Sequence, residues 1–306
     1  MKLEVRNITK SFGGKEILKG ISFSAESGKA LGLLGRNGAG KTTTIRILMD
    51  VFHADSGEIL LDGKSFDPRK MQIGYLPEER GLYPKRVVLE QMVYLARLRG
   101  TGKRQAVENS RKWLARLHVN QYEKSLLETL SKGNQQKVQL ASALVCDPEI
   151  VILDEPFSGL DPVNSQILQE VVKELITDGK IVIFSSHQMS YVEEFCEDVV
   201  IINQGEVVLN GNLQRIKKEF GESQLVISDV KRTREDMECL LQNQLAEYVE
   251  ITGRTREEVI VRLREGVSRN QLLQQLVSMK DIEIEHFETY KPSLNDIFVA
   301  KVGEEA

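Results

Sequence analysis

Cysteine and histidine are scarce in this chain of 306 residues, which contains only 3 cysteines and 4 histidines. Cys146, Cys196 and Cys239 lie far apart and show no Cys-x-x-Cys spacing, so they predict neither a disulfide framework nor a redox motif. The histidines are dispersed as well, and their spacing indicates no metal cluster. We therefore expect thiols without a chemical role and no zinc-type site.

Long apolar runs and an excess of basic charge are absent too. The apolar runs at 150–153 and 199–202 fall far short of the roughly 18 to 20 residues that cross a bilayer. The chain has 41 Lys and Arg against 45 Asp and Glu, whereas nucleic-acid binding usually needs a clustered basic face. We expect no nucleic-acid partner, and any connection to a membrane must go through another protein.

The chain is long enough for two domains, and the first part of its apolar pattern predicts a parallel α/β core. The nearly continuous apolar run at 30–34 is typical of a strand buried on both faces, and a glycine-rich loop and a helix at 41–50 follow it. This order favours an α/β domain at 1–215 with a helical subdomain at about 79–147. The other expected elements are strands at 2–9, 21–25, 150–153 and 181–185, helices at 87–99, 104–117, 132–145 and 162–177, and a hairpin within 199–209.

A second pattern begins near residue 222 and predicts a small α+β domain at 222–306. Its segments alternate as β-α-β-β-α-β, the order of a ferredoxin-like domain, and a closing helix is expected near 294–300. No set of catalytic side chains is visible in this part. The segments lie at 225–227, 234–242, 248–251, 259–263, 271–279 and 282–287.

The segment after the 30–34 strand matches G-x-x-x-x-G-K-[ST], the phosphate-binding loop. Phosphate oxygens need several backbone N–H donors that converge on one point, and a helix start adds free N–H groups with a partial positive charge. Lys41 would reach the β- and γ-phosphates, and the hydroxyl of Thr42 would bind Mg²⁺. A chance glycine turn is the alternative, but the strand and the helix stand on the required sides. The expected nucleotide-binding residues are Gly35, Asn37, Gly38, Ala39, Gly40, Lys41, Thr42 and Thr43.

Two carboxylates, Asp154 and Glu155, follow the aliphatic strand at 150–153. Open α/β sheets bind ligands beyond the carboxyl ends of their strands. We therefore expect Asp154 to hold Mg²⁺ through water, and Glu155 to orient or deprotonate the attacking water beside the γ-phosphate. A strand-end cap or a solvated turn would give the same two residues, but the phosphate loop weakens that alternative.

Ser131 begins a predicted helix in the stretch Leu130-Ser131-Lys132-Gly133-Asn134-Gln135-Gln136. Serine is a good N-cap, and helix capping alone would explain its place. Taken with the phosphate loop and Asp154, however, the chain resembles the nucleotide-binding domains of ABC transporters over about residues 1–215. The stretch looks like the signature sequence of that family, LSGGQ, with Ser131 and Gly133 at its essential positions. The resemblance implies that both residues, with Asn134, contact nucleotide.

Three further positions match the same family. Phe12 stands where its members place an aromatic ring against adenine, although a core phenylalanine at a strand end is the alternative. The segment that ends at Asp161 is similar to the D-loop, which communicates across the dimer. His187 matches the switch histidine, which contacts the γ-phosphate and positions Glu155. A lone histidine at a strand end is more often structural, but this one follows the other family motifs in the expected order along the chain.

Two positions depart from the family pattern. Glu78 stands where the Q-loop usually has glutamine, and a carboxylate there would bind Mg²⁺ more tightly but repel the γ-phosphate without the metal. Lys132 replaces the first glycine of the signature, and its side chain points either toward the facing nucleotide or into solvent. With residues 76–83 and 292–298, these departures resemble a bacterial branch associated with sodium extrusion, drug resistance and related export.

The resemblance also implies a mechanism and partners. Two copies meet head to tail, and each ATP lies between the phosphate loop of one copy and the signature helix of the other, so ATP favours closure and hydrolysis removes that preference. ATP and Mg²⁺ are the implied ligands, and Lys41, Glu155 and His187 are the implied catalytic residues.

An integral-membrane permease is the implied second partner. The chain would then lie peripherally on the cytoplasmic side of the membrane and drive the export of sodium ions, drugs or peptides. A soluble ABC ATPase or a regulatory module is the alternative. The sequence does not identify the transported substrate, because the transport pathway would lie in the permease.

Overall fold

The computed structural model describes residues 1–79, 81–222, 224–279 and 281–303. The chain divides into two compact units, Met1–Leu213 and Gln214–Ala306, which we call unit 1 and unit 2. Among the described residues, every helix is too short or too polar to cross a bilayer.

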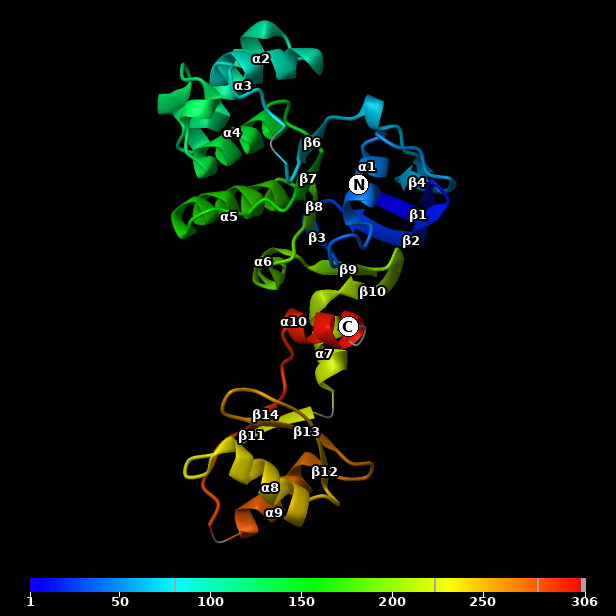
Figure 1. Cartoon of the computed structure of the whole chain (residues 1–306), viewed down its shortest axis with the longest axis vertical. Helices are drawn as coiled ribbons and strands as arrows, with labels where there is room; N and C mark the ends of the chain where they lie inside the picture. The colour runs from blue at the N-terminus through cyan, green and yellow to red at the C-terminus, as the bar shows by residue number, and fades with distance from the viewer. Residues whose placement is uncertain (80, 223, 280, 304–306) are drawn as a thin grey trace. The chain divides into compact units, whose positions relative to one another are not determined.

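A six-stranded sheet forms the centre of unit 1 (Figure 1). Neighbouring strands in it are parallel except for the last hairpin, in which β9 and β10 are antiparallel. Every residue of β7 and β8 is buried, which explains why the first four residues of each strand are apolar. The order is β10-β9-β3-β8-β7-β6, with bounds β3 (Lys29–Leu34), β6 (Ile73–Leu76), β7 (Ile150–Asp154), β8 (Ile181–Ser185), β9 (Asp198–Asn203) and β10 (Glu206–Asn212). The strands and the hairpin predicted for this core are confirmed.

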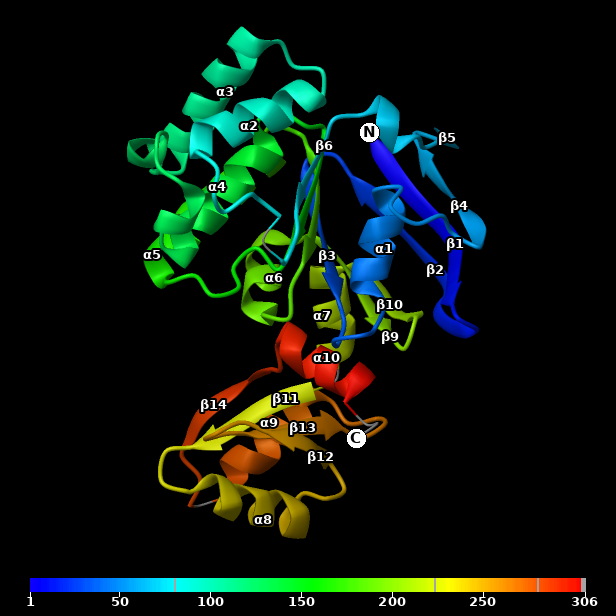
Figure 2. The same cartoon turned by 45° about the horizontal axis from the view of Figure 1, so that its top comes forward.

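The two faces of this sheet carry different layers. A short helix, α1 (Lys41–Leu48), and a second, antiparallel sheet cover one face, whereas α5 (Pro162–Thr177) and α6 (Met189–Phe195) cover the other (Figures 1 and 2). Apolar side chains of α1, both sheets and the loop between them form one buried cluster. The second sheet has the order β2-β1-β4-β5, with bounds β1 (Lys2–Phe12), β2 (Lys15–Glu26), β4 (Ser56–Leu61) and β5 (Lys64–Ser65). The sequence did not predict β4, β5 or α6.

A β-bulge in β1 explains an irregular apolar pattern. Strict alternation would place Leu3 and Val5 on one face and Ile8 on the other, yet all three are buried in the same cluster. The pairing of β1 with β2 shifts register between Val5 and Ile8, and Asn7 has a positive φ of 50°. The bulge therefore turns Ile8 back toward the core.

Three helices form the helical part of unit 1: α2 (Val88–Leu98), α3 (Lys103–Arg116) and α4 (Lys132–Leu144). They agree with the helices predicted within residues 79–147. Short 3₁₀ turns at Asn120–Tyr122 and Leu127–Thr129 lie between α3 and α4, and another at Pro68–Lys70 precedes β6. Helix α4 approaches β6 closely, because a Cβ at Gly74 would lie only 2.8 Å from the carbonyl oxygen of Ala143. A side chain at residue 74 would push the helix away from the sheet.

Unit 2 contains a four-stranded antiparallel sheet of order β12-β13-β11-β14. The strands and the two helices between them alternate as β-α-β-β-α-β, as the sequence predicted, and the closing helix is confirmed. Apolar residues of α8 and α9 form one cluster with the sheet, including Leu241 and Leu272. The bounds are α7 (Leu213–Gly221), β11 (Gln224–Asp229), α8 (Arg234–Gln244), β12 (Val249–Arg254), β13 (Val259–Leu263), α9 (Arg269–Ser278), β14 (Ile284–Thr289) and α10 (Leu294–Val302).

Capping boxes mark the starts of three helices in unit 2. Thr233, Ser268 and Ser293 each accept a hydrogen bond from the backbone N–H three residues later, and each side chain at that third position bonds back. Reciprocal capping satisfies two backbone donors at once, so the local sequence fixes where these helices begin.

Candidate active site

The loop between β3 and α1 is built from backbone conformations that favour glycine. Gly40, just before α1, has a φ of 116°, and a Cβ there would lie 2.6 Å from Leu18 Cδ2. A Cβ at Gly35 would lie 2.4 Å from the carbonyl oxygen of Ile202. The loop can therefore pack tightly against β2 and β9, and the first N–H groups of α1 have no partner within the helix.

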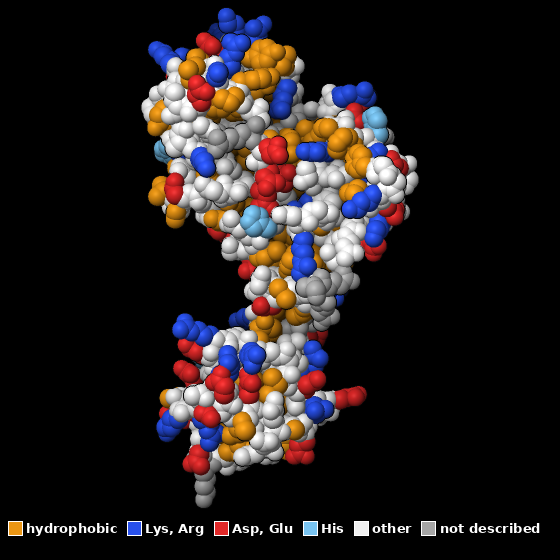
Figure 3. All heavy atoms as spheres, in the orientation of Figure 1, with side chains coloured by type: hydrophobic (Ala, Val, Ile, Leu, Met, Phe, Trp, Pro, Cys, Tyr) orange, Lys and Arg blue, Asp and Glu red, His pale blue; other side chains and the backbone are white. Residues whose placement is uncertain are grey.

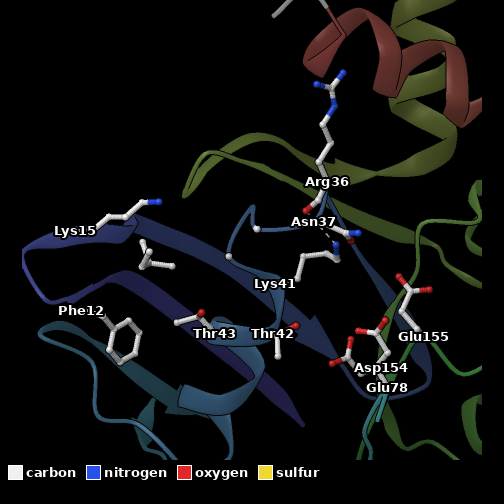
Figure 4. Close-up of a pocket in the computed structure, with 13 residues that line it drawn as sticks. Phe12, Lys15, Arg36, Asn37, Lys41, Thr42, Thr43, Glu78, Asp154 and Glu155 are labelled. Atoms are coloured by element: carbon white, nitrogen blue, oxygen red, sulfur yellow. Dashed lines mark hydrogen bonds between the residues drawn. The ribbon is translucent and has the colours of Figure 1, made fainter. Parts of the chain in front are cut away.

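A cavity of about 540 Å³ lies in front of this loop (Figure 4). Phe12 and Lys15 lie at one end of it, Glu78, Asp154 and Glu155 at the other, and the start of α1 between them. An aromatic ring at one end and carboxylates at the other suit an elongated ligand with a base and a phosphate chain. The complete lining is Phe12, Lys15, Ile17, Arg36, Asn37, Gly38, Gly40, Lys41, Thr42, Thr43, Glu78, Asp154 and Glu155.

Lys41 projects back over the loop that precedes it. Its Nζ donates to the carbonyl oxygen of Gly35 at 2.6 Å and lies 3.4 Å from that of Arg36. Only 8% of the residue is exposed, and this burial lowers the pKa of the ammonium group, while the nearby carboxylates, Glu155 foremost, act in the opposite direction. The side chain is therefore a buried cation placed on the phosphate loop.

Asp154, the last residue of β7, and Glu155, which follows it, are buried although they line the cavity. Asp154 is 2% exposed and accepts a hydrogen bond from the hydroxyl of Ser185, at the end of the neighbouring strand β8. Glu155 is 6% exposed, has a positive φ of 49°, and its N–H donates to the Ser185 carbonyl oxygen at 3.1 Å. A non-glycine residue held in the left-handed region is typical of functional sites, where the surrounding structure maintains the strain.

His187 contacts Glu155 directly. Its Nδ1 lies 2.8 Å from Glu155 Oε2, and the Ser186 hydroxyl lies 3.4 Å from the same oxygen. The imidazole side chain is 60% exposed, while the Glu155 side chain is 7% exposed. Figure 3 shows acidic side chains gathered on one face of unit 1, with a histidine beside them. The pair thus joins a buried carboxylate to a solvent-facing imidazole.

The chemistry of one group of cavity-lining residues suits Mg²⁺. Thr42 offers a hydroxyl, and Asp154 and Glu78 offer carboxylates, in the same cavity. Mg²⁺ prefers oxygen ligands and keeps several waters, so one or two protein carboxylates with a hydroxyl and nucleotide phosphates suffice. No group of three or more His, Cys, Asp or Glu side chains suited to a metal occurs in the described part of the chain.

The residues expected from the signature stretch and the D-loop do not line this cavity. Ser131 caps α4, and its hydroxyl accepts from the N–H of Asn134 at 3.4 Å. Asp161 caps α5 and accepts from the N–H of Asn164 at 2.9 Å. The two helix starts meet at Gly133, where a Cβ would lie 2.9 Å from Asn164 Nδ2. Lys132 is exposed, in agreement with the solvent-facing one of the two alternatives that its sequence position left open.

Several residues of the site gave no signal in the sequence. Ser185 and Ser186 hold the two carboxylates, yet serines after a strand carry no motif. Tyr75, on β6, is half-buried, and burial with the charge of Asp154 raises its pKa to about 12, so it stays protonated at neutral pH. Gln136 Nε2 donates to the carbonyl oxygen of Pro156 at 2.5 Å and so ties α4 to the loop after Glu155. Such contacts depend on the pairing of distant segments.

Two family models match this chain. The model described as ABC transporter matches residues 18–158, which include the phosphate loop, the signature stretch and both carboxylates. The model described as the C-terminal domain of ATP-binding proteins like DrrA1-3 matches residues 211–302, which fall almost entirely in unit 2.

Known proteins and structures resemble the chain over long stretches. The uncharacterized ABC transporter ATP-binding protein YhaQ of Bacillus subtilis is 41% identical over 98% of this chain and 98% of its own length. The linearmycin resistance ATP-binding protein LnrL of the same organism is 36% identical over 72% of each chain. A solved ATP-binding subunit of an ABC transporter is 29% identical, with a TM-score of 0.67, over 72% of this chain and 94% of its own. The chain therefore belongs to the ABC transporter ATP-binding proteins, and it is an ATP-binding subunit that hydrolyses ATP.

Proposed function

We propose that this subunit drives export through a separate membrane permease, to which it binds on the cytoplasmic side. The cavity between Phe12 and Glu155 carries the proposal, because its shape and charge suit a nucleotide with its γ-phosphate at the carboxylates. The linearmycin resistance relative supports the direction, because export would serve resistance. Drugs, peptides and sodium ions are the solutes to test first.

In this proposal the cavity binds adenine, the phosphates and Mg²⁺ with different groups of residues. Phe12 stacks on adenine, an interaction worth about 1–3 kcal/mol for a base on an aromatic ring. Lys41 and the N–H groups at the start of α1 bind the β- and γ-phosphates. Thr42, Asp154 and Glu78 hold Mg²⁺, which neutralises phosphate charge when it is bound. The loop residues that complete the phosphate cradle are Gly35, Asn37, Gly38, Ala39, Gly40 and Thr43.

Glu155 is the general base in this proposal, and His187 sets its orientation. A carboxylate at the γ-phosphate end can accept a proton from the attacking water. The contact of 2.8 Å between His187 Nδ1 and Glu155 Oε2 holds the carboxylate, while the exposed imidazole remains available to the γ-phosphate. The positive φ of Glu155 and the Ser185 bond to its backbone fix where the side chain begins.

A second copy of the chain completes the site in this proposal. Ser131, Gly133 and Asn134 lie outside the lining of their own cavity, at the start of α4. The free N–H groups of that helix start and the Ser131 hydroxyl suit a γ-phosphate supplied by a partner copy. Asp161 caps the neighbouring helix and connects this surface to the loop after Glu155. ATP then favours the closed dimer because only that state offers both sets of donors.

The domains have separate tasks in the same proposal. Residues 1–215 form the ATPase domain, with a helical subdomain at about 79–147, and residues 222–306 form an accessory domain. Beside α2 lies a pocket of about 520 Å³ lined by Tyr83, Arg86, Glu90, Gln91 and Tyr94. Buried Gln91 accepts a hydrogen bond from the N–H of Tyr83 at 3.0 Å and so fixes the pocket wall. We place the permease contact there.

Replacing Tyr94 with glutamate is expected to weaken permease binding without changing the ATPase activity of the isolated chain. The Tyr94 residue is 55% exposed at this pocket, and buried aromatic anchors often contribute 2 kcal/mol or more to an interface, so affinity should fall about 10-fold or more. The measurement is binding of the purified chain to its permease in detergent. Val277→Glu, which places a glutamate at an exposed apolar position of α9 in unit 2, is the control. Equal binding by the Tyr94 variant and the wild type would remove the pocket from the interface.

Reconstitution with the membrane partner tests the proposed function as a whole. In proteoliposomes, we expect ATP turnover to rise when an exported solute is present, and that solute to accumulate on the side opposite the nucleotide-binding subunits. Drugs, peptides and sodium ions would be compared in the same preparation. Solute movement toward the ATP-binding side would contradict export, and failure to bind any permease would contradict a transport role.

A further inference from the structure

Gln139 of α4 bonds the backbone on both sides of Glu78. Its Nε2 lies 3.3 Å from the carbonyl oxygen of Pro77 and 3.1 Å from that of Glu79. A carboxamide nitrogen carries two N–H donors, so one side chain can serve both acceptors at once. The residue is only 8% exposed, so its amide nitrogen bonds these two carbonyl groups and not bulk water. The pair of bonds brackets one carboxylate-bearing residue.

The packing of α4 on β6 brings Gln139 within reach of that loop. Ala143 lies against Gly74, where the absence of a side chain allows the close approach. Gln139 lies about one helical turn before Ala143, and Pro77 follows β6 directly, so helix and strand run in opposite directions at this contact. The fold of unit 1 therefore brings the Gln139 side chain to the loop that follows β6.

The Glu78 side chain depends on its backbone for its position. It lines the 540 Å³ cavity and also a smaller pocket of about 170 Å³ that Gln139 and Lys132 share. In the described part of the chain, no hydrogen bond or ion pair holds its carboxylate, and the residue is exposed. Because the exposed carboxylate of Glu78 has no such partner, its side chain can turn toward either pocket. The position of the backbone at residues 77–79 therefore determines whether the carboxylate oxygens of Glu78 lie near Asp154.

We propose that Gln139 is a positioning residue that fixes Glu78 at the Mg²⁺ end of the nucleotide cavity. The inference rests on the proposed role of Glu78 as a ligand of Mg²⁺. Without the two amide donors, the Pro77 and Glu79 carbonyls lose a protein partner and the loop can move, although Glu78 keeps its charge. Because α4 begins at Ser131, the same contact joins the metal end of one site to the helix that faces the other copy.

The test measures ATP affinity with and without Mg²⁺, in full-length chains that carry Glu155→Gln so that ATP is not consumed. Gln139→Met keeps the length and flexibility of the side chain but removes its donors. We expect the strengthening of ATP binding by Mg²⁺ to fall about 10-fold, as for other supporting residues around metals, while the affinity without Mg²⁺ stays unchanged. Gln105→Met, at an exposed position of α3, is the matched control and is expected to change neither value.

Two further variants separate the possible outcomes. In Glu78→Ala, most of the strengthening of ATP binding by Mg²⁺ should also be lost. Adding Gln139→Met to the Glu78→Ala variant should weaken ATP binding no further. Gln139→Asn keeps the amide but shortens its reach, so the same pattern is expected if the methionine variant folds poorly. The inference would be overturned if Gln139→Met lowered ATP affinity equally with and without Mg²⁺. It would also be overturned if the effect of Gln139→Met added fully to that of Glu78→Ala in the double variant. An unchanged Mg²⁺ effect in Glu78→Ala would overturn the proposed role of Glu78 as well.

Discussion

Glu155→Gln is expected to lower ATP turnover about 100-fold or more, because glutamine cannot accept the proton of the attacking water. ATP binding and ATP-driven dimerisation should persist, since the change keeps the size of the side chain and leaves Lys41 in place. The His187 contact, 2.8 Å in the wild type, becomes a neutral hydrogen bond and no longer orients a charge. Phosphate release under saturating ATP and dimer formation by light scattering are the two measurements.

Glu257→Gln serves as the control for this prediction. Glu257 is exposed in unit 2, so the variant makes the same chemical change far from the proposed chemistry in sequence. Its turnover should equal that of the wild type. Near-normal turnover in Glu155→Gln would contradict the general-base assignment, and loss of ATP binding in that variant would give Glu155 a different role.

Lys41→Ala is expected to abolish nucleotide binding in practice, with an ATP dissociation constant raised about 100-fold or more. Lys41 is the buried cation of the loop, and alanine would leave the β- and γ-phosphates facing Glu155, Asp154 and Glu78 without it. The repulsion between these carboxylates and the phosphates would then add to the lost hydrogen bonds. Titration with a fluorescent ATP analogue measures the effect.

The control for Lys41 must remove a lysine without touching the cavity. Lys19→Ala removes an exposed ion pair with Glu206, and such pairs contribute little, so binding should not change. Thermal unfolding without nucleotide checks that both variants are folded. An ATP dissociation constant unchanged in Lys41→Ala would remove the phosphate-loop assignment altogether.

Much of the fold was predictable because local signals agreed with the tertiary structure. The first four residues of β7 and of β8 are all apolar, as expected of buried strands, and the capping boxes of unit 2 define helix starts within a few residues. The missed elements lack such signals. β4 begins with Ser56 and Gly57 and is mostly exposed at its start, and α6 has only 7 residues. Their formation depends on the strands and helices they pack against.

The candidate site divides in the same way. Asp154 ends β7, Glu155 follows it directly, and Lys41 begins α1 after the glycine-rich loop, so their motifs could be recognised along the chain. The groups that hold the site come from elsewhere in the chain. Ser185 ends a neighbouring strand, and Gln139 bonds the two residues that flank Glu78, which are 62 and 60 positions away in the sequence. A buried glutamine in a helix looks like any polar helical residue until the packing of α4 on β6 is known.

The decisive measurement is the structure of the Glu155→Gln variant loaded with ATP and Mg²⁺. We expect a dimer in which Ser131 Oγ of each copy lies at a hydrogen-bond distance, about 3 Å, from the γ-phosphate held by Lys41 of the other copy. A nucleotide-loaded sample in which Ser131 is remote from every γ-phosphate would contradict the proposed coupling of ATP binding to dimer closure.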